Sequence, residues 1–86
     1  MELKVGSVVI SKAGRDKGKF LAVMRIEPDG VYVSDGKERP VERPKKKNPV
    51  HLQKTHYMVS EAETAANRSL IRALRQFSDP DEREVK

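Results

Sequence analysis

The chain has 86 residues and a mass of 9.7 kDa, which is room for one small domain and excludes two. Hydrophobic and charged residues each make up 36% of the chain, so its core must be thin and fills at most a small barrel or sandwich with one covering element. Eighteen Lys and Arg against 13 Asp and Glu give a net charge of +5, which favours a polyanionic partner.

Short β-rich segments separated by turns run through the first two thirds of the chain. The expected strands are residues 8–12, 20–27, 31–34, 40–42 and 51–55. Pro28-Asp29-Gly30 and Asp35-Gly36 supply hairpin turns. Strands at this spacing predict a mainly β protein, with a five-stranded antiparallel barrel over residues 1–58.

Apolar residues occupy both faces of the second expected strand. Leu21 and Val23 lie on one face of this strand. The opposite face carries four apolar residues at alternate positions: Phe20, Ala22, Met24 and Ile26. The first half of this strand is therefore expected to be buried on both sides. In the third strand, Val31 and Val33 face one way. Tyr32 faces the other way, where it either stacks on a base or lies half-buried beneath the helix.

One amphipathic helix is expected over residues 60–77. Ser60 and Glu63 form a capping box. Apolar residues then recur at helical spacing, at Ala62, Ala66, Leu70, Ala73, Leu74 and Phe77. Asp79-Pro80 ends the helix, because Pro disfavours helical backbone at the residue before it.

The helical segment thus occupies residues 59–78, and residues 79–86 are expected to be a flexible polar tail. The face with Leu70, Leu74 and Phe77 has two open roles. It packs on the barrel and covers an apolar face, or it docks on a protein partner or a second copy of the chain.

Little in the sequence supports catalysis. His51 and His56 are five residues apart, which places them on opposite faces of a strand rather than together as a pair. Asp16, Asp29 and Asp35 stand in turns, where Asp accepts local hydrogen bonds. The absence of Cys excludes thiolate metal sites. We therefore expect a protein that is not an enzyme and that has no catalytic residues, bound metal or cofactor.

The longest unbroken apolar run extends from Phe20 to Met24. Its five residues are too few for a membrane-spanning helix or the core of a signal peptide. The lack of Cys is consistent with a reducing compartment. The sequence therefore predicts a cytoplasmic protein with no membrane association.

Basic residues are concentrated in residues 1–58, which hold 13 Lys and Arg against 7 Asp and Glu. They form two clusters, which together with two glycines give the predicted RNA-binding residues: Lys12, Gly14, Arg15, Lys17, Gly18 and Lys19 in the first, and Arg39, Arg43, Lys45, Lys46 and Lys47 in the second. Glycines let the backbone approach a phosphate while Lys and Arg neutralise it. The first loop is expected to carry no core residue.

Residues 8–19, Val-Val-Ile-Ser-Lys-Ala-Gly-Arg-Asp-Lys-Gly-Lys, resemble a KOW motif, the β–loop–β unit of some ribosomal proteins and of NusG-type elongation factors. The chain is most similar to small bacterial relatives of the KOW-containing large-subunit ribosomal protein family of archaea and eukaryotes, which share the runs at residues 33–37, 39–42 and 44–48.

The resemblance covers residues 3–55 and implies an SH3-like barrel whose first loop, residues 14–19, contacts RNA. Many KOW motifs carry a further Gly where this chain has Phe20-Leu21, which favours the ribosomal branch over the elongation factors. The helix lies outside the resemblance.

These observations favour a non-catalytic protein that binds structured ribosomal RNA in association with the ribosome. The alternative is an SH3-like protein-interaction module that docks on a ribosomal protein or RNA polymerase. Salt separates the two, because binding through Z phosphates gives a log–log slope of about −0.7Z to −0.9Z, whereas binding through an apolar protein interface depends little on salt.

Overall fold

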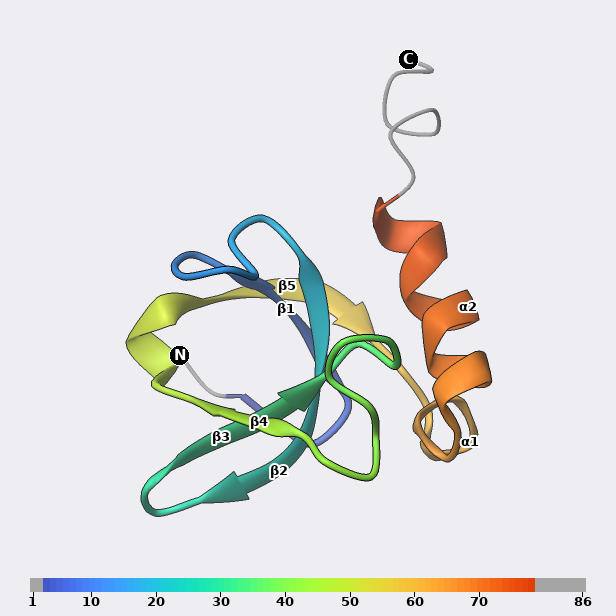
Figure 1. Ribbon diagram of the computed structural model, residues 1–86, viewed down its shortest axis with the longest axis horizontal. Coiled ribbons are helices and arrows are strands. Elements are labelled where there is room, and N and C mark those ends of the chain that lie inside the picture. Colours follow the sequence, from blue (N-terminus) through green and yellow to red (C-terminus); the bar gives the residue numbers. More distant parts are fainter. Residues whose placement is uncertain (1–2, 79–86) are drawn as a thin grey trace.

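The computed structural model describes residues 3–78 (Figure 1). Five strands form one antiparallel sheet: β1 (Ser7–Ser11), β2 (Phe20–Glu27), β3 (Gly30–Ser34), β4 (Lys45–Lys47) and β5 (Leu52–Met58). Their order across the sheet is β4-β3-β2-β1-β5. The 3₁₀ helix η1 (Pro49–His51) joins the two edge strands along the chain. No ladder pairs β4 with β5 within residues 3–78, so the sheet is strongly bent but does not close into the expected barrel.

The fourth strand lies a few residues later than the sequence predicted. Residues 40–42 are in a turn and are not free to pair as a strand. The Val41 N–H donates to Asn67 Oδ1 at 2.7 Å, and Pro40 has no backbone N–H. The Lys45–Lys47 segment pairs with residues 31–33 of β3 instead. A run of lysines is poor strand sequence in a sheet interior, but it is well tolerated at an edge.

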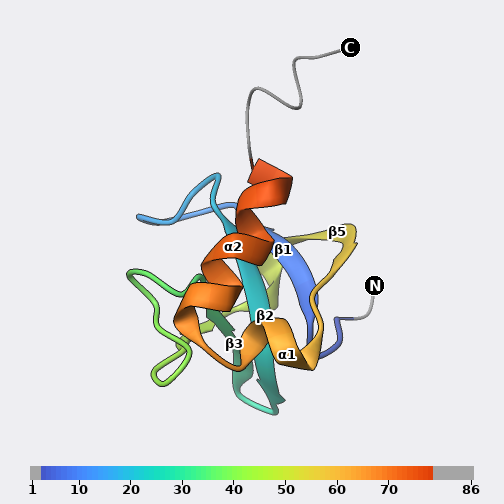
Figure 2. The same cartoon turned by 90° about the vertical axis from the view of Figure 1, so that its right-hand side faces the viewer.

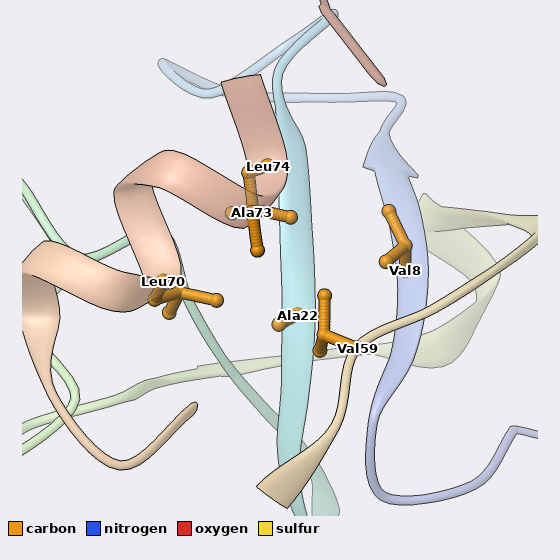
Figure 3. Close-up of a cluster of buried hydrophobic side chains, with 6 residues drawn as sticks. All are labelled: Val8, Ala22, Val59, Leu70, Ala73 and Leu74. Carbon is orange, nitrogen blue, oxygen red and sulfur yellow. The ribbon is translucent and has the colours of Figure 1, made fainter. Parts of the chain in front are cut away.

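Strand β2 lies between two apolar cores, as its sequence predicted. Leu21 and Val23 face one cluster of buried side chains, completed by Val9, Val31, Val33 and Leu52. Ala22 faces the other, completed by Val8, Val59, Leu70, Ala73 and Leu74 (Figure 3). Both clusters therefore depend on the same strand.

The prediction for Ile26 was wrong. The ladder between β2 and β3 changes register between Val23 and Arg25, and such a bulge exchanges the two faces of a strand. Ile26 then lies opposite Val31 rather than on the side of Ala22, and it is 44% exposed.

The helical region consists of two helices, α1 (Glu61–Thr64) and α2 (Asn67–Ser78), where one was expected. The predicted capping box is present at the start of α1. From the first turn of α2, the Ser69 hydroxyl lies 3.0 Å from the carbonyl oxygens of Glu63 and Ala66, so it satisfies groups that the break releases.

Helix α2 covers the outer face of the sheet (Figure 2). Leu70 is 0% exposed and Leu74 5% exposed, and both pack on the chain's own β1 and β2 side chains (Figure 3). The Phe77 ring stacks on that of Tyr57 with their centroids 4.2 Å apart. The proposed partner face of the helix is thus used within this chain. The predicted tail, residues 79–86, lies outside the described residues.

Candidate nucleic-acid interface

A buried carboxylate joins the two basic segments. Asp16, in the loop between β1 and β2, is 1% exposed. Its Oδ2 lies 3.4 Å from Arg39 Nη2 and 3.5 Å from Lys47 Nζ. The expectation that the first loop carries no core residue was therefore wrong, and so was the assignment of Asp16 to local turn hydrogen bonds.

Lys47 reaches Asp16 because of its position in β4. It lies opposite Val31 in the ladder, so its side chain shares the inner face of the sheet with that residue. Its ammonium also donates to Ser11 Oγ at 3.3 Å, and that hydroxyl donates to the Ala13 carbonyl at 2.9 Å. Lys47 thereby fixes the start of the first loop as well as its centre.

Arg39 and Lys47 were predicted to contact RNA, and the structure gives them a different environment. Their side chains are only 26% and 11% exposed, and the charges of both face Asp16. A cation that compensates a buried carboxylate costs too much to withdraw for an outside phosphate. These two residues position the basic segments rather than form the exposed part of an interface.

The loop between β3 and β4 is held at both ends. Asp35 Oδ1 accepts hydrogen bonds from the backbone N–H groups of Lys37 and Arg39 at 2.8 and 2.9 Å, which is the turn role predicted for it. At the other end, the Asn67 side chain binds the Val41 N–H and donates to the carboxylate of Glu42 at 3.0 Å. Donation from Asn67, helped by the Glu42 backbone N–H, lowers the pKa of Glu42 below its ordinary value of 4.5.

The other predicted cations are exposed, and they fall into two groups. Lys19 pairs with Glu38 at 3.2 Å, and Lys46 pairs with Asp29 at 3.4 Å. Of the cations predicted to bind RNA, five have no ion-pair partner within residues 3–78: Lys12, Arg15, Lys17, Arg43 and Lys45. We call these five residues the basic surface. Their segments project to the same side of the molecule (Figure 2), as the Asp16 contacts require.

Gly14 and Gly18 shape the loop that carries Arg15 and Lys17. Both have positive φ values, +79° and +86°, which few other residues adopt. The Gly18 N–H donates to the Ser11 carbonyl at 2.8 Å, so the loop turns back onto the end of β1. The two glycines are exposed, and the loop backbone is open to a ligand there.

Tyr32 makes its ring and hydroxyl contacts with Arg25 and Asp29 rather than with the helix. Its ring is half-buried, and the guanidinium of Arg25, on the neighbouring strand, lies 4.2 Å from the ring centroid. Its hydroxyl donates to Asp29 at 3.4 Å. Arg25 was missed at the sequence level because its alignment with Tyr32 depends on the bulge in β2.

No protein-family model matches the chain, and no curated protein matches it at a significant level. Within residues 3–78, no group of three His, Cys, Asp or Glu side chains could hold a metal ion. No helix in that part of the chain is both long and apolar enough to cross a membrane.

Proposed function

We propose that this protein is a non-catalytic RNA-binding protein that neutralises phosphates with its basic surface. The observation that carries the proposal is the buried Asp16, which ties the loop of Arg15 and Lys17 to the segments that carry Arg43 and Lys45. Backbone segments held in place before binding lose less conformational entropy when the cations they carry meet a phosphate. A protein that needed lysines only for solubility would gain nothing from this arrangement.

Phosphate contacts fix the register and orientation of a protein on a nucleic acid. Lys12, Arg15 and Lys17 surround a glycine-bounded turn, where an RNA backbone has room to approach. Few aromatic side chains are available, since the chain has two Tyr and two Phe. Selectivity would then come mainly from the shape of structured RNA.

The proposal includes the KOW resemblance, with an SH3-like fold whose sheet stays open, and ribosomal RNA in the cytoplasm as the target. In its support, the motif of residues 8–19 falls on β1 and the basic loop, and five antiparallel strands wrap around one of the cores. The alternative of a protein-docking module has less support, because Leu70 and Leu74 are buried against the chain's own sheet.

The test is the salt dependence of binding to a ribosomal RNA fragment, measured by fluorescence anisotropy. The variant Arg15→Ala/Lys17→Ala should flatten the log–log slope by about 1.5 units, one contact for each side chain. The matched control is Lys4→Ala/Arg68→Ala, which removes the same charge from exposed positions outside the basic surface. Equal slopes for the two variants, or binding that salt does not weaken, would contradict the proposal.

Sedimentation of cell lysate on sucrose gradients tests the ribosomal part. Co-migration with ribosomal particles at low salt, lost at high salt, is the expected result, because phosphate contacts weaken as salt rises. Migration with the free proteins at both salt concentrations would exclude stable ribosome association, and a flat salt slope in addition would favour the protein-docking alternative.

A further inference from the structure

A cavity of about 310 Å³ lies beside the basic surface, between α2 and the two loops. Its walls come from Gly18 and Lys19 at the end of the first loop, from residues 35 and 37, and from residues 71, 74 and 75 of α2. This volume is at the lower end of the range for ligand sites, so it suits one small unit of a larger ligand.

Chemically, the cavity has two parts. Phe20, Ile71 and Leu74 supply its apolar walls, while three cationic side chains line it as well: Lys19, Lys37 and Arg75. Each cation comes from a different segment of the chain. An apolar recess lined by cations matches a nucleotide, whose base is flat and whose phosphate is charged, better than it matches a wholly apolar ligand.

Asp35 is the acidic residue in the lining. Its Oδ1 already accepts two backbone hydrogen bonds, which fix the carboxylate in place. Its Oδ2 accepts none within residues 3–78 and so remains available to an N–H group of a base. The acidic side chain therefore suits a base edge, while the cations suit the phosphate.

The cavity walls are held together before any ligand binds. A Cβ on Gly36 would lie 2.7 Å from the Asn67 carbonyl oxygen and 2.9 Å from Ile71 Cγ1, so the loop backbone lies directly on α2. Asn67 also binds the Val41 N–H at 2.7 Å. The distance between loop and helix is consequently set by backbone contact.

We propose that this cavity seats one unpaired nucleotide of a bound RNA, with the base against Phe20 and Ile71 and the phosphate at Lys19, Lys37 and Arg75. The inference rests on the proposed RNA binding and deepens it, because it adds a base-dependent contact to the phosphate contacts of the basic surface. It also gives α2, which lies outside the KOW resemblance, a part in binding.

The test compares two ligands of equal charge on the full chain. One is a single-stranded heptanucleotide RNA, and the other is the same heptamer with every base removed. The bases should tighten binding by about tenfold, since one seated base contributes that much or more. In ¹⁵N-labelled protein, the amide signals of Phe20 and Ile71, which lie at the apolar walls, should move with the first ligand and not with the second.

A pair of helix variants separates the cavity from general charge. Arg75→Ala should weaken heptamer binding by about fivefold, whereas Arg68→Ala, an exposed cation in the first turn of the same helix, should weaken it less than twofold. Equal losses, or equal affinity for the two heptamers, would overturn the cavity assignment while leaving RNA binding by the basic surface in place.

Two further outcomes concern the source of the nucleotide and the proposed function. Guanosine 5′-monophosphate alone should bind far more weakly than the heptamer, because it makes no contact with the basic surface. Equally tight binding of the mononucleotide would overturn the assignment to RNA. No binding of either heptamer or of the ribosomal RNA fragment at low salt would overturn both proposals.

Discussion

The carboxylate of Asp16 holds an unusual position, at the centre of a basic loop and yet almost without contact with solvent. Its Oδ1 and the Nε of Arg39 are buried with no hydrogen-bond partner within residues 3–78. A half-satisfied buried cluster stabilises less than a complete one. The cluster acts mainly by positioning the chain, because it fixes three segments relative to one another.

Replacing Asp16 by Asn tests this at nearly constant volume. The change leaves Lys47 and Arg39 without their counter-charge, and we expect it to lower the free energy of unfolding by about 3 kcal/mol, measured by urea denaturation. The matched control is Asp29→Asn, whose partner Lys46 is 52% exposed and whose loss should cost less than about 1 kcal/mol. Similar costs for the two variants would show that burial adds nothing to the Asp16 cluster.

Glu42 provides a test of the other end of the same loop. Its pKa is lowered in the folded protein, so its contribution to stability is present above pH 4.5 and is lost as the pH falls through the folded-state pKa. The variant Asn67→Asp keeps an acceptor for the Val41 N–H but replaces the amide donor by a negative charge. The pKa of Glu42 should then rise, as followed by the NMR shift of its carboxyl carbon. An unchanged pKa would mean that Asn67 is not the cause.

At the scale of elements, the seating of the loop between β3 and β4 on α2 depends on Gly36. Gly36 and Gly18 have nearly the same φ, +83° and +86°, but a Cβ on Gly18 would meet nothing within 4 Å. Alanine at either position would lower the stability of the folded protein by about 1–2 kcal/mol, because positive φ is unfavourable for a residue with a Cβ. Only at Gly36 does it also press against α2.

We therefore expect Gly36→Ala to be less stable than Gly18→Ala by about 1–3 kcal/mol, the cost of overpacking. Urea denaturation of both variants measures the difference, and the shared strain cancels. If the two variants were equally stable, the loop would have to lie further from the helix than the structure places it.

The elements themselves could largely be predicted from the sequence, because alternation, turn residues and the capping box are local signals. The positions of β1, β2, β3 and the start of α1 follow from them. The fourth strand and the break before Asn67 could not be predicted from local signals. In the structure these two regions meet, because the Val41 N–H donates to Asn67 Oδ1 across distant parts of the chain. The exposure of Ile26 follows from a bulge that has no local signature here.

Half of the candidate interface could be predicted in the same way. Charge counting finds the exposed cations, but it does not separate Lys45 from Lys47, because their difference arises from which neighbour each meets. The one available signal was the lone acid of the first loop, Asp16, among four cations in residues 12–19. The cavity lining is also beyond local patterns, since Lys37 and Arg75 come together only through the packing of α2.

On the scale of the whole molecule, one strand holds two cores together. β2 sends Leu21 into the core within the bent sheet and Ala22 into the core beneath α2. Since alternate residues of one strand serve different layers, neither layer is complete without the other. The protein should consequently unfold in one cooperative step although its helix and sheet lie in separate layers.

Leu70→Ala tests this cooperativity from the helix side. Leu70 is 0% exposed and faces the core beneath α2, so its truncation should lower the free energy of unfolding by about 3 kcal/mol. Circular dichroism follows the helices, and tyrosine fluorescence follows Tyr32 on the sheet together with Tyr57, which stacks on Phe77. The two transitions should coincide in the variant and in the unmodified chain. If the helical signal were lost first while the Tyr32 resonances kept their folded positions in NMR spectra, the sheet would be stable without α2, and the helix would be an appendage rather than part of one domain.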